Sequence, residues 1–158
     1  NAQRLAYLQD AAARPDGVVP AWTTGRPAAA PGHPMRQALR ANDLRDWVPT
    51  RPLLLCGGQA DPTVFFGLNT GVMQAFWSAP SPAAMAPGLL SVLDVDAPVN
   101  GVDDPFAAVK TGFALSKAAA AAQGGPAAAL TLYHGALVPP FCHLAARGFF
   151  DRIIASGQ

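Results

Sequence analysis

The sequence predicts an α/β fold in which helices cover a small parallel sheet. Two short runs, residues 53–56 and 89–95, are rich in leucine and valine and have the length of buried strands. Segments with the apolar spacing of amphipathic helices lie before, between and after these runs. Because strands that alternate with helices form parallel sheets, the pattern favours an α/β over an α+β fold.

Length and composition limit the classes of function. A chain of 158 residues is long enough for one domain with a sizeable core, and 51% hydrophobic residues exclude disorder by composition. The net charge of +1, from 11 basic and 10 acidic residues, gives no electrostatic reason to expect nucleic acid as a partner. No run of 18 apolar residues occurs, so we expect no transmembrane segment.

Residues 1–48 form the first predicted domain, which combines helix with a proline-rich segment similar to a lid or cap. It begins with a short amphipathic helix over residues 1–13. Five prolines within residues 14–34 then predict an irregular loop, whose Trp22 needs an apolar cover. A second helix is expected over residues 34–47.

The second predicted domain, residues 49–158, begins with the first strand. Pro52 cannot donate a hydrogen bond to a sheet and suits the start of a strand, and a glycine pair ends it. Asp61 follows directly before Pro62, and an acid that precedes a proline is a helix-start signal. We therefore expect a helix over residues 62–78.

The second strand leads into the longest predicted helix. Asp94 and Asp96 come at the end of that strand, and a helix is expected over residues 105–123, ended by a Gly-Gly-Pro sequence. A short apolar run is then followed by His134, which we expect to lie in a loop, and a last amphipathic helix begins at a proline pair.

Asp61 and His134 are the candidate catalytic residues. In an open parallel sheet Asp61 would lie at the carboxyl edge of its strand, where such folds gather their chemistry. From a loop, the His134 ring could reach that edge and accept a proton from a hydroxyl. Each also has an ordinary interpretation, Asp61 as a helix cap and His134 as a hydrogen-bonded polar residue. Asp94 and Asp96 are rivals for the acid, but they follow the last strand.

The other two histidines have simpler interpretations. His33 lies in a Pro-Gly-His-Pro turn at the surface. His143 is spaced by four residues from Arg147 and Arg147 from Asp151, so these three form a polar stripe on the last helix. We interpret that stripe as a solvated face.

Two stretches resemble parts of the α/β-hydrolase family. Residues 52–64, PLLLCGGQADPTV, are similar to the strand and acid turn where the aspartate of a Ser-Asp-His triad follows the penultimate strand. Residues 130–150, LTLYHGALVPPFCHLAARGFF, are similar to the histidine loop and last helix. The order acid then histidine matches the family. The motifs resemble those of secreted bacterial lipases and esterases in particular.

The resemblance implies a carboxylic ester hydrolase in which Asp61 and His134 complete a Ser-Asp-His triad. It also implies that residues 49–158 are the carboxyl-terminal part of a doubly wound α/β-hydrolase sheet with flanking helices. The sequence has no G-x-S-x-G, so the serine would lie in a missing amino-terminal part of the same protein, which agrees with a chain that begins at Asn1. The serines that it does contain have other contexts: Ser78, Ser81, Ser91, Ser116 and Ser156.

The resemblance further implies a small apolar ester as substrate and a secreted or periplasmic location. Apolar residues near the proposed edge would suit an acyl or aromatic ester pocket: Trp22, Phe65, Phe66, Leu137 and Val138. We expect no cofactor, because the sequence has no phosphate-binding glycine loop, and no metal, because it lacks metal-ligand spacing.

Three alternatives stay open from the sequence. Cys56 and Cys142 could form a disulfide, or Cys56 could be a buried free thiol. The chain could be a self-sufficient helical domain with a small sheet instead of half of a larger sheet. It could also be a non-catalytic binding or assembly module for an apolar partner or ligand.

Overall fold

The computed structural model describes residues 2–16, 28–43, 47–79 and 84–157. It consists of two compact units, Asn1–Val48 and Pro49–Gln158. In the described residues, no helix combines the length and the hydropathy that a membrane span requires.

The first unit contains two helices, α1 (Ala2–Ala13) and α2 (Pro34–Ala41). The second is shorter than the predicted range of residues 34–47. It ends because Asn42 leaves the helical conformation and caps it, with both its backbone and its side-chain amide donating to the carbonyl of Ala38, at 3.1 and 2.8 Å.

Ion pairs connect the segments of this first unit. Arg36 is 3% exposed, and its guanidinium donates to the carboxylates of Asp10 at 2.6 Å and Asp16 at 2.7 Å. The leucines of the predicted apolar face of α1 are not covered, since Leu5 is 57% and Leu8 53% exposed. The amphipathic pattern therefore predicts the helix correctly, but not the residue that it buries, which is Asp10.

The second unit contains a parallel sheet of two strands, β1 (Leu53–Gly57) and β2 (Leu90–Asp94). The register pairs Leu55 with Val92. Both strands lie where the apolar runs predict them, because leucine and valine side chains on a covered sheet bury apolar area on both faces.

The segment that follows β1 begins with a turn and continues as a helix. A π-helical turn, η2 (Gly67–Gly71), leads into α3 (Val72–Ser78). The segment predicted as a helix over residues 62–78 therefore becomes helical only at Gly67, where η2 begins, because the residues that directly follow Asp61 form a hydrogen-bonded turn on its carboxylate.

The second half of this unit is helical. α4 (Ala107–Leu132) contains a kink at Gly125, whose φ of 77° and ψ of 175° break the helix just before Pro126, at the predicted Gly-Gly-Pro stop. A second π-helical turn, η3 (Tyr133–Leu137), joins it to α5 (Val138–Ser156). The predicted histidine loop is thus wrong, because His134 lies inside a continuous run of helical turns.

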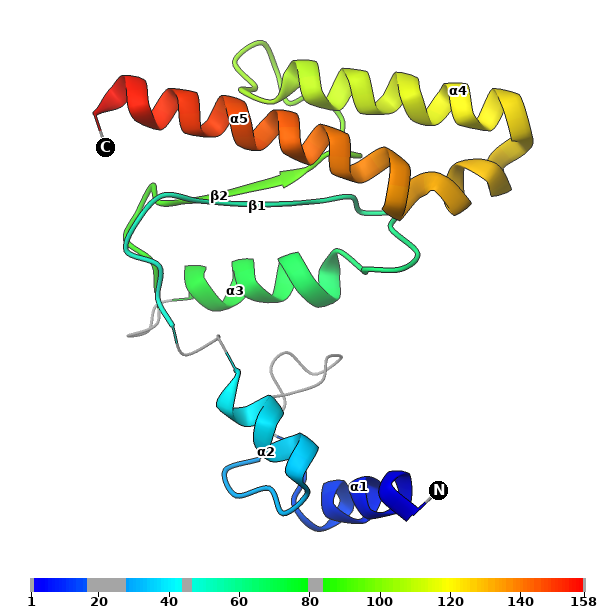
Figure 1. The fold of residues 1–158 in the computed structure, drawn as a ribbon. Helices are drawn as coiled ribbons and strands as arrows, with labels where there is room; N and C mark the ends of the chain where they lie inside the picture. Colours follow the sequence, from blue (N-terminus) through cyan, green and yellow to red (C-terminus); the bar gives the residue numbers. More distant parts are fainter. Residues whose placement is uncertain (1, 17–27, 44–46, 80–83, 158) are drawn as a thin grey trace. The chain divides into compact units, whose positions relative to one another are not determined.

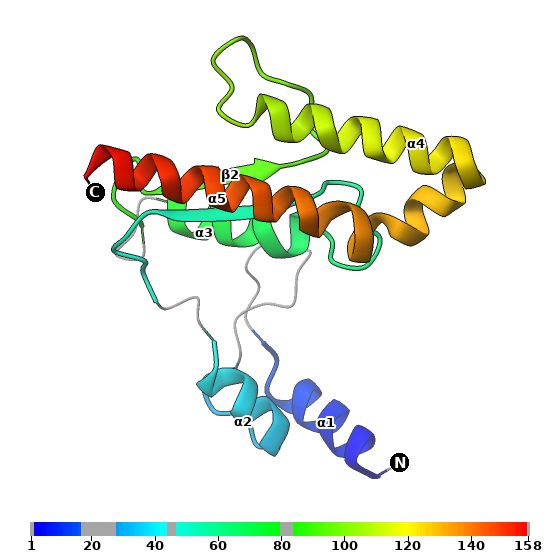
Figure 2. The ribbon, with the colours of Figure 1, turned by 45° about the horizontal axis from the view of Figure 1, so that its top comes forward.

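Figures 1 and 2 show α5 and α3 on opposite sides of the two strands. The main core lies between the sheet, α4 and α5. It is built from eight buried side chains, Leu93, Val95, Phe106, Phe113, Tyr133, Leu137, Val138 and Ala145.

The predicted fold class is wrong. Helices make up 59% of the described residues, and the sheet has two strands, so no doubly wound α/β sheet is present in the part of the chain that the structure describes. The sequence contains two runs with strand character, and these cannot build a larger sheet. The observed architecture agrees with the alternative of a mostly helical fold with a small sheet.

A disulfide joins β1 to α5. Cys56 and Cys142 are bonded, with their Cα atoms 5.7 Å apart, and both side chains pack against the main core. The bond connects the strand that precedes Asp61 with the helix that follows His134, across 86 residues of sequence. It settles the alternative that the sequence left open for these cysteines.

We predict that reducing this disulfide lowers the free energy of unfolding by up to about 4–5 kcal/mol, because a loop of this length gains much conformational freedom when it opens. Urea unfolding of the chain with and without reductant measures the effect. The double variant Cys56→Ala/Cys142→Ala is the control, since its midpoint should not respond to reductant. A wild-type midpoint that does not move on complete reduction would contradict the prediction.

Candidate functional site

Asp61 is a buried carboxylate whose first oxygen is occupied by the backbone. It is 5% exposed and lies four residues after the end of β1. Its Oδ1 accepts hydrogen bonds from the amides of Thr63 at 2.8 Å and Val64 at 2.9 Å. Proline at position 62 favours this turn because its ring fixes φ near the value that a turn requires. The turn directs the second oxygen away from the backbone amides.

The second oxygen of Asp61 meets His134. The Oδ2 atom lies 2.8 Å from Nδ1 of His134, although 73 residues separate the two in the sequence. The structure therefore brings together the two residues that the sequence predicts as a pair. The Asp61 side chain is 4% exposed and the His134 side chain 47% exposed, so the acid is covered and the imidazole reaches solvent.

This contact determines which nitrogen of the imidazole carries a proton. An ionised carboxylate can only accept hydrogen bonds, so Nδ1 of His134 must carry the proton that lies between them. In the neutral ring Nε2 then holds the free lone pair and is the basic atom. In the described part of the chain, Nε2 makes no hydrogen bond to another residue, and no described serine is hydrogen-bonded to this histidine.

Asp61 is ionised at neutral pH. Burial acts to raise its pKa, but the amide of Val64, the ring of His134 and the amide of Thr63 stabilise the carboxylate, and together they hold its pKa below the usual value of 3.8. The pair is therefore an ionised carboxylate hydrogen-bonded to the imidazole of a half-exposed His134.

Sequence reasoning missed a second polar group beside this pair. Tyr133 is fully buried, and its hydroxyl donates to Oδ2 of Asp96 at 2.7 Å. The same hydroxyl accepts a hydrogen bond from the amide of Ala60 at 3.2 Å. The one available signal was the position of Tyr133 directly before His134, which does not by itself predict a contact with the end of β1.

The ring of Tyr133 also explains the second glycine after β1. A Cβ atom at Gly58 would lie 2.5 Å from the hydroxyl oxygen and 2.7 Å from Cε1 of Tyr133. Real Cβ atoms do not approach other atoms so closely, so the chain can pass the ring only with glycine here. The glycine pair therefore does more than end the strand.

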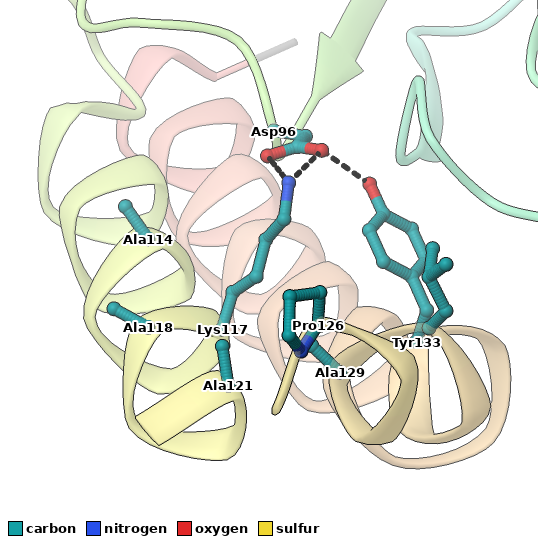
Figure 3. Close-up of a pocket in the computed structure, with 9 residues that line it drawn as sticks. Asp96, Ala114, Lys117, Ala118, Ala121, Pro126, Ala129 and Tyr133 are labelled. Carbon is teal, nitrogen blue, oxygen red and sulfur yellow. Dashed lines mark hydrogen bonds and ion pairs between the residues drawn. The ribbon is translucent and has the colours of Figure 1, made fainter. Parts of the chain in front are cut away.

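Asp96 also forms a salt bridge with Lys117. Nζ of Lys117 lies 2.8 Å from Oδ1 and 2.7 Å from Oδ2 of Asp96, and 5.5 Å from the centre of the Tyr133 ring. Figure 3 shows these three side chains at one end of a hollow of about 520 Å³, between the arms of the kinked α4. Its walls are mainly apolar, formed by Ala114, Ala118, Ala121, Pro126, Ala129 and Leu130.

The remaining candidates take structural roles. Asp94 accepts from the amides of Gln59 at 3.0 Å and Asp96 at 2.9 Å. His33 is the N-cap of α2, where its Nδ1 accepts from the amide of Met35. His143 is exposed on α5, as its polar stripe predicts.

The apolar residues suggested for an ester pocket differ in their exposure. Leu137 and Val138 belong to the main core and are each 8% exposed. They face the core because the π-helical turn and the start of α5 are packed against it. Phe65 is 54% exposed, Phe66 is half-buried, and Trp22 lies outside the described residues. Within those residues, no group of three metal-ligating side chains is placed to hold a metal ion.

We predict that Asp61→Asn weakens the acid dependence of stability. The depressed pKa of Asp61 means that its carboxylate stabilises the folded state above the unfolded-state pKa, and this contribution is lost as the pH falls through the folded-state value. Asparagine keeps an oxygen for the amides of Thr63 and Val64 but cannot ionise.

Urea unfolding between about pH 7 and pH 2 measures this effect, since the loss should begin below about pH 5. Wild type should lose more free energy of unfolding over that range than Asp61→Asn. The other acidic groups are common to both proteins and cancel in the difference. Equal losses in the two proteins would show that the Asp61 carboxylate is not stabilised by folding.

Comparisons of this chain with protein-family models, with curated protein sequences and with solved structures found no match.

Proposed function

We propose that the chain carries the acid and the base of a serine ester hydrolase. The observation that carries the proposal is the 2.8 Å contact between Oδ2 of a buried Asp61 and Nδ1 of a half-exposed His134. This is the orientation in which an aspartate fixes the tautomer of a catalytic histidine and stabilises its cation. The nucleophilic serine would come from polypeptide outside these 158 residues.

The proposed reaction uses the Nε2 nitrogen of His134. Nε2 takes the proton of the serine hydroxyl as its oxygen attacks the ester carbonyl, and the imidazolium is stabilised by Asp61. The same nitrogen then gives that proton to the departing alkoxide, which leaves as the alcohol. A water molecule, deprotonated by Nε2, then attacks the acyl-enzyme carbonyl, and the imidazolium returns that proton to the serine oxygen as the carboxylic acid leaves. The burial of Asp61 supports its role, because a covered carboxylate is screened less by water.

The proposed substrate is a small apolar ester. The mainly apolar walls of the hollow in the elbow of α4 support this class of ligand. We also propose a secreted or periplasmic location. The Cys56–Cys142 disulfide supports it, because disulfides persist in oxidising compartments.

A second candidate is a binding or assembly module with an apolar partner. Large apolar side chains on the two long helices favour it, because several are more than half exposed, including Leu115, Leu144, Phe150 and Ile154. Hydrolysis of a chromogenic short-chain ester separates the two candidates, since a binding module would not accelerate it.

We predict that His134→Ala abolishes ester hydrolysis by the complete enzyme, with kcat falling on the order of 10⁴- to 10⁶-fold, because the base that activates the serine is removed. Turnover of a p-nitrophenyl ester measures the loss. His143→Ala is the matched control, since this histidine is exposed on α5 and should keep wild-type turnover. Full activity in His134→Ala with an intact fold would refute the proposed function.

A further inference from the structure

We propose that Tyr133 is a positioning residue that sets the distance between Asp61 and His134. The inference rests on the proposed function, in which these two residues act as a pair. Tyr133 directly precedes His134, and Ala60 directly precedes Asp61. The Ala60 amide donates to the Tyr133 hydroxyl at 3.2 Å, so the neighbours of the two functional residues are themselves hydrogen-bonded.

The direction of each hydrogen bond at the hydroxyl is determined. Asp96 as a carboxylate can only accept, so the single hydroxyl proton of Tyr133 points to Asp96 Oδ2, at 2.7 Å. The lone pairs of the hydroxyl oxygen are then free to accept from Ala60. Burial and the neighbouring Asp96 raise the pKa of Tyr133 well above its usual range, which keeps this proton in place.

Asp96 is held in turn by Lys117. The ammonium contacts both carboxylate oxygens, at 2.8 and 2.7 Å, and balances the charge of this partly buried carboxylate (Figure 3). The Tyr133 ring is confined by Gly58 on one side and by an edge-to-face contact with Phe113, with ring centres 5.5 Å apart. The hydroxyl therefore has a fixed position.

The turn that ends at Asp61 is held along its whole length. Its three successive amides are bonded to different groups: Gln59 to Asp94 Oδ1 at 3.0 Å, Ala60 to Tyr133, and Asp61 to the Gly58 carbonyl at 3.1 Å. Of these three bonds, the one from Ala60 connects the turn to the helical segment that carries His134. Tyr133 is fully buried, which agrees with a role in holding the pair.

The test is Tyr133→Phe, which keeps the ring and removes one oxygen. We expect faster hydrogen exchange at the amides of Ala60 and Asp61 in the 158-residue chain, because the Ala60 amide loses its acceptor. In the complete enzyme we expect kcat for a p-nitrophenyl ester to fall roughly 10- to 100-fold with KM little changed, since small displacements of catalytic groups cost rates of this size. The chain has two tyrosines, so Tyr7→Phe on α1 is the matched control and should change neither readout.

A pair of variants at Asp96 covers the case in which Tyr133→Phe does not fold. Asp96→Asn keeps an acceptor for the hydroxyl and should retain protection of the Ala60 amide, whereas Asp96→Ala should lose it. Unchanged exchange and unchanged kcat in Tyr133→Phe would overturn the inference, as would equal protection in the two Asp96 variants. Full activity in His134→Ala would instead refute the proposed function, and the exchange readout would still decide whether Tyr133 holds the turn.

Discussion

The close approach of Tyr133 to the end of β1 is the constraint on which the rest of the second unit depends. The ring passes Gly58 at a distance that admits no side chain, and its hydroxyl is buried with two partners. A phenol can enter the core in this way only if both its donor and its acceptor capacity are used. The contact brings the segment that carries His134 to the turn that carries Asp61. The Cys56–Cys142 disulfide also joins β1, which precedes Asp61, to α5, which follows His134.

Within this arrangement the two oxygens of the Asp61 carboxylate have different partners. Oδ1 satisfies two backbone amides of the turn, and Oδ2 is left to the imidazole. The amides stabilise the ionised form in a site where burial alone would disfavour it. As a result, a carboxylate that is almost fully covered remains charged and can orient a histidine that reaches solvent.

The sequence predicted the parts of this site whose signals are local. Leucine and valine runs located both strands, and the Gly-Gly-Pro sequence located the kink in α4. The Asp61–His134 pairing came from a resemblance to a known family, since 73 residues separate the two. The prediction of a doubly wound sheet was wrong because the resemblance implied more strands than the two found in the described residues.

The contacts of Tyr133 could not be predicted, because they arise where two distant segments pack and have no pattern in either segment alone. The same holds for Leu137 and Val138, whose apolar character suited an ester pocket as well as a core. Apolar composition predicts that such residues are covered, but only the packing of η3 and α5 determines what covers them.

The central claim is that Asp61 and His134 activate a serine from outside this chain. Intact-mass spectrometry of the native protein after treatment with a fluorophosphonate, which traps activated serines, tests it most directly. The claim predicts an adduct on a serine outside the 158 residues, and its loss in His134→Ala. An unlabelled protein, or an adduct that forms equally fast in His134→Ala, would contradict it.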